Sequence, residues 1–200
     1  MGVVSIILGY LLGSISTSYI VGKITRGVDV RNYGSGNAGA TNTLRVLGWK
    51  MALVVLVGDI LKGVLAIAFA SLVTGGDAHV TSRVYMALAG LSAIVGHNWP
   101  VFLQFRGGKG VATTIGVLAV LSFFPTLYAG LLALVIILLT RYVSLGSLVL
   151  IVFTFIFQFF LHTPSVYIVV TFIIGVLVFW RHRENIVRLL HGKENRISFR

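Results

Sequence analysis

Long apolar runs are the feature that most constrains the fold of this chain. Near residues 3–22, 51–73, 83–96, 143–161 and 164–180 they approach or reach the roughly 20 residues that a membrane-crossing helix needs. Of the 200 residues, 57% are hydrophobic and 10% are charged, and the mean hydropathy is +0.98. We therefore predict an all-α integral membrane protein in which residues 1–200 form a single transmembrane domain.

The apolar stretch from residue 111 to 140 fits either one overlong helix or two short helices, each of about 14 residues, that meet at Phe124 and Pro125. The distribution of basic residues decides between one helix and two. Residues 22–50 carry five basic residues against one acidic residue, and residues 181–200 carry six against two, so both segments are expected on the cytoplasmic side. Only two helices bring the tail back inside. We predict seven transmembrane helices, with the N-terminus outside, the C-terminus cytoplasmic and two short helices meeting near Pro125.

The formal net charge of +11 does not indicate nucleic acid, because basic cytoplasmic loops explain it and no nucleic-acid-binding motif accompanies it. The absence of cysteine excludes disulfides, thiolate metal sites and a cysteine acyl-enzyme. No ligand cluster has convincing metal spacing, so we predict neither a metal nor another cofactor.

Three polar motifs fall on the predicted cytoplasmic side. The first is GSGNAGATN at residues 34–42 with Arg45, the second is GHNWPVFLQFRGGKG at residues 96–110, and the third is RHRENIVR at residues 181–188. Glycine allows backbone N–H groups to approach a ligand closely. The GGKG run directly precedes the span that starts at Val111, so the free N–H groups of that helix should face the loop. Thr41 and Asn42 are natural N-caps for a helix that follows the first motif. Both glycine loops are predicted to bind phosphate at the membrane surface.

Alternatives exist for these glycines. GGKG lacks the full Walker pattern, because Lys109 is followed by Gly110 rather than Ser or Thr, which argues against nucleotide hydrolysis. Close packing between membrane helices is the other use of such glycines, and it stays open.

Asp59 and Lys62 lie three residues apart inside a predicted span, on one face of its helix. Such residues either pair or line a polar cavity, and we favour pairing. His97 beside Asn98 fits equally a general base or an interfacial hydrogen-bonding pair.

Taken together, the three motifs resemble those of the PlsY-type acyl-phosphate:glycerol-3-phosphate acyltransferases of bacterial membranes. The resemblance covers the whole chain, including its length, its basic loops and the order of the motifs. It implies transfer of a fatty acyl group from acyl phosphate to the 1-hydroxyl of glycerol 3-phosphate, which yields lysophosphatidic acid and phosphate. The active site would lie on the cytoplasmic face of a multi-pass protein of the bacterial cytoplasmic (inner) membrane. The implied partners are the two substrates and membrane lipid, without nucleic acid, and the oligomeric state stays open.

The resemblance also implies roles for individual residues. It assigns catalysis to Ser35, Arg45, His182 and Asn185, and a structural role to Glu184. A structural role is also expected for the pair of Asp59 and Lys62. The resemblance assigns binding of glycerol 3-phosphate to Gly107, Gly108, Lys109 and Gly110. From their place in the three polar motifs we also expect substrate binding by Gly34, Gly36, Asn37, Gly39, Thr41, Asn42, His97, Asn98 and Arg188. We expect residues 34–45 to hold acyl phosphate and the GGKG run to hold glycerol 3-phosphate.

Acyl phosphate is an activated mixed anhydride, so orientation and charge neutralisation could suffice for direct attack by the substrate hydroxyl. His182 is the favoured base, although a substrate phosphate could take the proton. Ser35 is expected to donate a hydrogen bond rather than to act as a nucleophile, because no base is adjacent to it in sequence. Transport is the rival function. It needs polar groups through the bilayer, and only Asp59 and Lys62 lie deep in the predicted spans.

Overall fold

The computed structural model describes residues 1–197, which form helices and connecting loops without a β-strand. The prediction of an all-α chain is thereby confirmed. The chain divides into two compact units, residues 1–120 and the residues from Leu121 onward.

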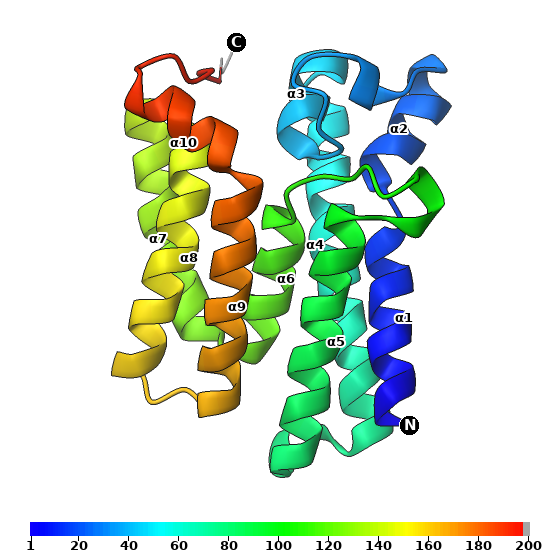
Figure 1. The fold of residues 1–200 in the computed structure, drawn as a ribbon, viewed down its shortest axis with the longest axis vertical. Coiled ribbons are helices and arrows are strands. Elements are labelled where there is room, and N and C mark those ends of the chain that lie inside the picture. The colour runs from blue at the N-terminus through cyan, green and yellow to red at the C-terminus, as the bar shows by residue number, and fades with distance from the viewer. Residues whose placement is uncertain (198–200) are drawn as a thin grey trace. The chain divides into compact units, whose positions relative to one another are not determined.

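The first unit is built from six helices (Figure 1). Helix α1 packs along α5 and α4, and α3 packs against the start of α4. Three single-turn 3₁₀ segments, η1 (Val30–Asn32), η2 (Gly76–Ala78) and η3 (Val101–Leu103), lie in the connections. The helices are α1 (Gly2–Ser14), α2 (Thr17–Arg26), α3 (Ala40–Leu47), α4 (Trp49–Thr74), α5 (Val80–Asn98) and α6 (Val111–Leu121), of which the last reaches the boundary between the units.

Close helix contacts in this unit depend on residues without a side chain. A Cβ atom at Gly13 would collide with the backbone of Ala93, and one at Gly96 would collide with the carbonyl oxygen of Tyr10. The packing alternative raised from the sequence therefore holds for Gly96, the first residue of the second motif.

The second unit contains α7 (Phe123–Thr140), α8 (Val143–Phe160), α9 (Ser165–Arg181) and α10 (Arg183–Leu190). Helix α8 packs against both α7 and α9, and α10 contacts α8 and α9 (Figure 1). Gln158 on α8 is fully buried, and its Nε2 donates hydrogen bonds to Ser122 Oγ at 2.8 Å and to Thr171 Oγ1 at 2.9 Å. This amide ties the residue before α7 to both neighbouring helices.

The apolar stretch from residue 111 to 140 does form two helices, as predicted, but they are unequal. The break falls at Ser122, so α6 has 11 residues and α7 has 18. Pro125 is the third residue of α7, where the missing N–H has no helical partner to lose. The expectation of two halves of about 14 residues is wrong, because proline is tolerated in the first turn of a helix and so marks a helix start here.

The first predicted span, near residues 3–22, is also interrupted. Helix α1 ends at Ser14 and α2 begins at Thr17, with Ser16 as its N-cap. The carbonyl oxygen of Ile15 at this break accepts a hydrogen bond from Lys62 Nζ at 2.9 Å.

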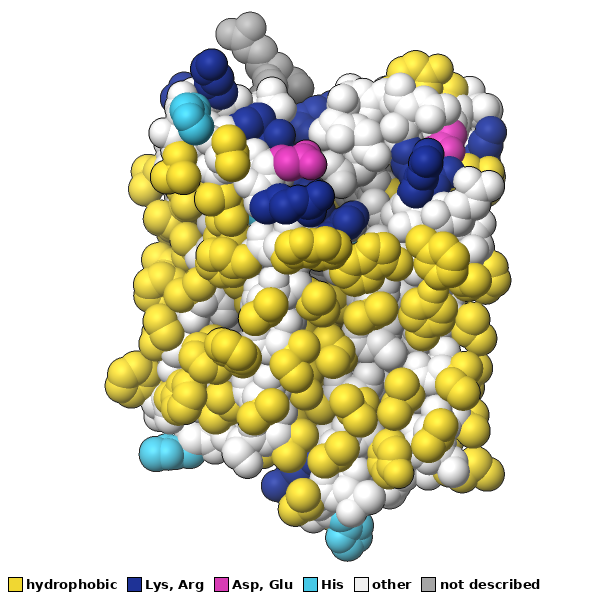
Figure 2. Space-filling view, in the orientation of Figure 1, with side chains coloured by type: hydrophobic (Ala, Val, Ile, Leu, Met, Phe, Trp, Pro, Cys, Tyr) yellow, Lys and Arg dark blue, Asp and Glu magenta, His cyan; other side chains and the backbone are white. Residues whose placement is uncertain are grey.

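Five helical segments of the described chain are long and apolar enough to cross a membrane: 2–26, 49–74, 80–103, 123–140 and 143–160. Helices α9 and α10, which meet at a 62° bend, pass the same test as a pair, and α6 is a shorter apolar helix. Hydrophobic side chains cover the sides of the helices, as Figure 2 shows, which is the surface that lipid requires. The count of seven spans and the side of each terminus stay predictions.

Candidate active site

The first motif folds as a tight loop around the side chain of Asn42. Its Nδ2 donates to the carbonyl oxygens of Val30 at 2.8 Å and Tyr33 at 3.1 Å, and its Oδ1 accepts from the backbone N–H of Ser35 at 2.8 Å. Gly34 adopts φ +61°, and a Cβ atom there would collide with Asn42 Oδ1. The buried amide therefore fixes the path of residues 30–35.

The prediction that Thr41 and Asn42 cap the following helix is wrong. Helix α3 begins at Ala40 behind Gly39, which has no capping side chain, so both residues lie inside the first turn. Asn42 Oδ1, the atom that a cap would use, accepts instead from the backbone N–H of Ser35. The predicted role of Asn42 in substrate binding stays a prediction.

Ser35 and Arg45 lie at the surface of this loop and helix. Both side chains are exposed, and Arg45 sits in the last turn of α3. Within residues 1–197 no carboxylate lies within ion-pair distance of the Arg45 guanidinium group. Its charge is thus not paired with a carboxylate of the described chain, which is compatible with the predicted binding of phosphate.

Arg31 joins the first motif to the second, a connection that the sequence did not reveal. Its Nη1 donates to the carbonyl oxygens of Leu103 at 3.2 Å and Arg106 at 3.1 Å, while its Nη2 lies 2.6 Å from Asp29 Oδ2. The hydrogen-bonded guanidinium of Arg31 holds the pKa of the Asp29 carboxyl below its ordinary value. The ion pair orients Arg31 toward the loop before GGKG.

Gly108 is where the two glycine loops meet. Its N–H donates to the carbonyl oxygen of His97 at 3.1 Å. A Cβ atom at this position would collide with the carbonyl oxygen of Ala38 from the first motif and with Nε2 of His97. Only glycine allows the loop to pass between Ala38 and His97. The first and second motifs are therefore in contact at this residue.

The GGKG run leads directly into α6, which begins at Val111 as predicted. Asn98 lies beside this junction, 1% exposed, and neither its Oδ1 nor its Nδ2 has a hydrogen-bond partner. A Cβ atom at Gly110 would lie 2.8 Å from Asn98 Oδ1. A buried donor and acceptor thus remain uncommitted near the N–H groups that begin α6, an arrangement suited to a polar ligand.

A buried ionic network lies on the other side of His97. Asp59 is 1% exposed, and its Oδ1 lies 2.9 Å from Lys62 Nζ, so the predicted pair is present. The same oxygen accepts from Thr17 Oγ1 at 3.1 Å and lies 3.6 Å from His97 Nδ1. Asp59 therefore pairs with Lys62 and also faces His97, whose carbonyl oxygen accepts the hydrogen bond from Gly108.

The third motif lies in the second unit. His182 is 2% exposed, and its Nδ1 lies 2.8 Å from the carbonyl oxygen of Val178. Glu184, expected to support the structure, has a side chain that is 75% exposed and lies 3.9 Å from Arg183. The roles predicted for His182, Asn185 and Arg188 stay predictions.

The buried carboxylate of the second unit is Glu194, which the sequence did not single out. It accepts hydrogen bonds from Asn185 Nδ2 at 2.6 Å, Arg188 Nε at 2.8 Å and Ser144 Oγ at 3.0 Å. Burial opposes its charged form, but the three hydrogen bonds together hold the pKa of Glu194 below its ordinary value. Nothing local in the sequence marks this residue, because Ser144 lies 50 positions away.

Known proteins of one family are similar to this chain over nearly its whole length. Residues 3–192 match the family model described as glycerol-3-phosphate acyltransferase. Relatives of that name from Shouchella clausii and Bacillus subtilis are 50% and 44% identical, over 98% and 97% of this chain and 96% of each relative. In the described part of the chain, no three His, Asp or Glu side chains are grouped to hold a metal ion.

Two crystal structures of PlsY, described as an integral membrane glycerol 3-phosphate acyltransferase, have similar folds. The glycerol 3-phosphate form has a TM-score of 0.90 at 41% identity and covers 98% of this chain and 96% of its own. The lysophosphatidic acid form has a TM-score of 0.89 at 40% identity, with 98% and 95% covered. The resemblance carried by the three motifs is confirmed over almost the whole length, and the chain belongs to the PlsY family of integral membrane glycerol-3-phosphate acyltransferases.

Proposed function

We propose that the protein transfers a fatty acyl group from acyl phosphate to the 1-hydroxyl of glycerol 3-phosphate. The ligands named for the two related PlsY structures, glycerol 3-phosphate and lysophosphatidic acid, differ by one acyl group, which is the net change of this reaction. The proposed location is the cytoplasmic face of the bacterial inner membrane. The basic segments 22–50 and 181–200 support that side.

The observation that carries the proposal is the meeting of the two glycine loops at Gly108. The carbonyl oxygen of Ala38, the ring of His97 and the start of α6 converge on this residue. Both substrates of the proposed reaction carry phosphate, and two glycine loops in contact would hold the two phosphate-bearing substrates close to each other. We assign acyl phosphate to residues 34–45 and glycerol 3-phosphate to the GGKG run.

The proposed chemistry is direct acyl transfer. The 1-hydroxyl oxygen attacks the carbonyl carbon of acyl phosphate, the bond from that carbon to the phosphate oxygen breaks, and phosphate leaves with the electron pair. Arg45, Lys109 and backbone N–H groups stabilise the phosphate charges. The proton of the hydroxyl passes to a base.

Three groups compete for the role of base. His182 remains the favoured candidate, because a proton on Nδ1 that faces the Val178 carbonyl places the lone pair of the neutral ring on Nε2. His97 has a comparable arrangement, with Asp59 near Nδ1 and Gly108 near Nε2. A substrate phosphate is the third. Activity that survives replacement of both histidines by glutamine would assign the proton to the substrate phosphate.

Ser35 is proposed to donate a hydrogen bond to phosphate or to the acyl carbonyl. Its backbone N–H is fixed by Asn42, and its side chain is exposed at the loop surface. No histidine or carboxylate in residues 1–197 forms an ion pair or hydrogen bond that would activate its hydroxyl as a nucleophile.

The donor is tested by giving the purified protein, in detergent, labelled glycerol 3-phosphate with either acyl phosphate or an acyl thioester of the same chain length. We expect lysophosphatidic acid and phosphate in equal amounts from acyl phosphate, and no product from the thioester. The reverse preference would refute the proposed donor while leaving glycerol-3-phosphate acylation intact. The Arg45→Ala variant should lose most of the turnover with acyl phosphate.

A further inference from the structure

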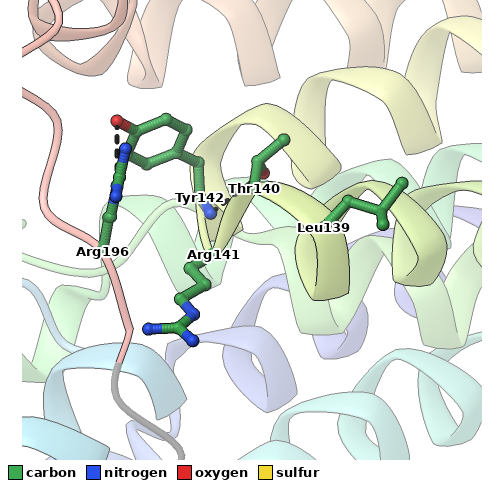
Figure 3. A pocket seen from close by; sticks show the side chains of 5 residues that line it. All are labelled: Leu139, Thr140, Arg141, Tyr142 and Arg196. Carbon is green, nitrogen blue, oxygen red and sulfur yellow. Dashed lines mark hydrogen bonds between the residues drawn. The ribbon is translucent and has the colours of Figure 1, made fainter.

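A cavity of about 500 Å³ lies where α7 ends and α8 begins, within the second unit. Figure 3 shows the five side chains that line it: Leu139, Thr140, Arg141, Tyr142 and Arg196. None of them belongs to the three motifs, and the proposed acyl transfer uses none of them.

Two arginines are placed at this cavity by contacts that do not involve acidic groups. Arg141 ends α7 with φ +62°, and its carbonyl oxygen accepts a hydrogen bond from the N–H of Ile197 at 2.9 Å. The guanidinium of Arg196 lies 5.3 Å from the centre of the Tyr142 ring, and its Nε donates to Tyr142 Oη at 3.3 Å (Figure 3). Backbone pairing and stacking on an aromatic ring thus hold the tail across the α7–α8 junction.

The carboxylate on this part of the tail is already committed elsewhere. Glu194 is 9% exposed and accepts hydrogen bonds from Ser144, Asn185 and Arg188. In the described chain, neither Arg141 nor Arg196 has a carboxylate within ion-pair distance. Two guanidinium groups at one cavity, without a counter-charge among residues 1–197, favour binding of an anion, and their planar donors match phosphate oxygens. The Tyr142 hydroxyl accepts from Arg196, so its proton can be donated to the same ligand.

The surface beside the cavity indicates which anion. Leu139 is 77% exposed, and it continues a row of exposed apolar residues along α7 formed by Leu131, Leu134, Val135 and Leu138. Their spacing places them on one side of the helix, where lipid chains lie. A soluble phosphate would use the arginines but not this row. We propose that the cavity binds the headgroup phosphate of an anionic phospholipid whose acyl chains lie along α7.

The test is native mass spectrometry of the purified full-length protein in detergent, titrated with phosphatidylglycerol, phosphatidylcholine or inorganic phosphate. We expect one phosphatidylglycerol to bind with higher affinity than phosphatidylcholine, and inorganic phosphate not to compete at millimolar concentration. The Arg141→Gln/Arg196→Gln variant should bind phosphatidylglycerol at least about tenfold more weakly, since each arginine near an anionic headgroup contributes about fivefold. Equal competition by inorganic phosphate would contradict the lipid assignment.

Arg183→Gln/Lys193→Gln is the matched control, because it removes the same two charges from exposed positions of α10 and the tail. Its affinity for phosphatidylglycerol should stay within about threefold of the wild type. An equal loss in both variants would show that general surface charge, and not this cavity, holds the lipid. Arg141→Lys/Arg196→Lys keeps the charges but loses the planar donors, so its affinity should lie between those of the wild type and the glutamine variant.

A second measurement avoids the question of whether the glutamine variant folds. Phosphatidylglycerol with a photoreactive headgroup is cross-linked to the wild-type protein, and the labelled peptides are sequenced. Labelling of residues 139–142 together with residues 195–197 supports the site, and labelling confined to other helices overturns it.

Discussion

At the scale of single residues, Gly108 and Glu194 matter through what surrounds them. Gly108 passes between Ala38 and His97, where any side chain would collide with both. Glu194 accepts hydrogen bonds from Asn185 and Arg188 of α10 and from Ser144, which lies 50 positions away in the sequence. The importance of both residues follows from their contacts in the folded protein and not from their neighbours in the sequence.

The Gly108→Ala variant should lose at least about 100-fold in kcat/KM, because its Cβ must push the first motif and His97 apart and small displacements at a reacting centre have effects of this size. Gly130→Ala is the control. Its added Cβ would meet Leu150 at 4.0 Å, an ordinary contact, so its activity should match the wild type. Equal activity of both variants in the lysophosphatidic acid assay would show that the two loops need not touch.

The pKa of Glu194 is lowered in the folded protein, which gives a direction to the pH dependence of the tail. The stabilisation is complete above the ordinary carboxyl value of about 4.5 and is lost as the pH falls through the lower folded value. The protection factors of the α10 amides, which compare their hydrogen exchange with the intrinsic rate at the same pH, should therefore fall on acidification below about pH 4.5. Glu194→Gln should remove this dependence, whereas Glu184→Gln, at an exposed carboxyl, should keep it.

At the scale of elements, the ionic network of α4 connects three helices of the first unit. Lys62 reaches the carbonyl oxygen of Ile15 at the α1–α2 break, and Asp59 faces Thr17 on α2 and His97 on α5. The sequence predicted the pair from its spacing of three residues. The sequence could not predict the break between α1 and α2 or the approach of Asp59 to His97, because both depend on how α4 packs against helices distant in sequence.

The Lys62→Met variant should destabilise the protein by about 3–5 kcal/mol, because it leaves the buried Asp59 carboxylate without its closest cation. Thermal unfolding in detergent measures the effect. Asp59→Asn/Lys62→Met removes both charges and should recover most of the stability. If the double variant is as unstable as the single one, the cost arises from lost packing and not from an unpaired charge.

At the scale of the whole molecule, the sequence predicted the all-α membrane fold and the family. Apolar runs and basic loops predicted the helices, because a bilayer fixes the length and surface of anything that crosses it. The order of the three motifs predicted the family. The capping role of Thr41 and Asn42 was wrong, and Arg31 and Glu194 were missed, since their partners lie across loops whose path no local pattern reveals.

Labelling of introduced cysteines can test the predicted topology without background labelling, because the chain itself contains no cysteine. Asp77→Cys lies in the predicted outer loop and should react with a membrane-impermeant maleimide in intact spheroplasts. Asn195→Cys lies in the predicted cytoplasmic tail and should react only after the membrane is permeabilised. Labelling of both residues in intact spheroplasts would contradict the arrangement of seven spans.

Direct transfer from acyl phosphate to the substrate hydroxyl is tested most closely by rapid-quench measurement of phosphate release in a single turnover. With glycerol 3-phosphate present, we expect phosphate and lysophosphatidic acid to appear at the same rate and in equal amounts. Without the acceptor, we expect no burst of phosphate and no acylated protein by mass spectrometry. A phosphate burst equal to the enzyme concentration, together with an acyl group on Ser35, would show a covalent intermediate and contradict the account.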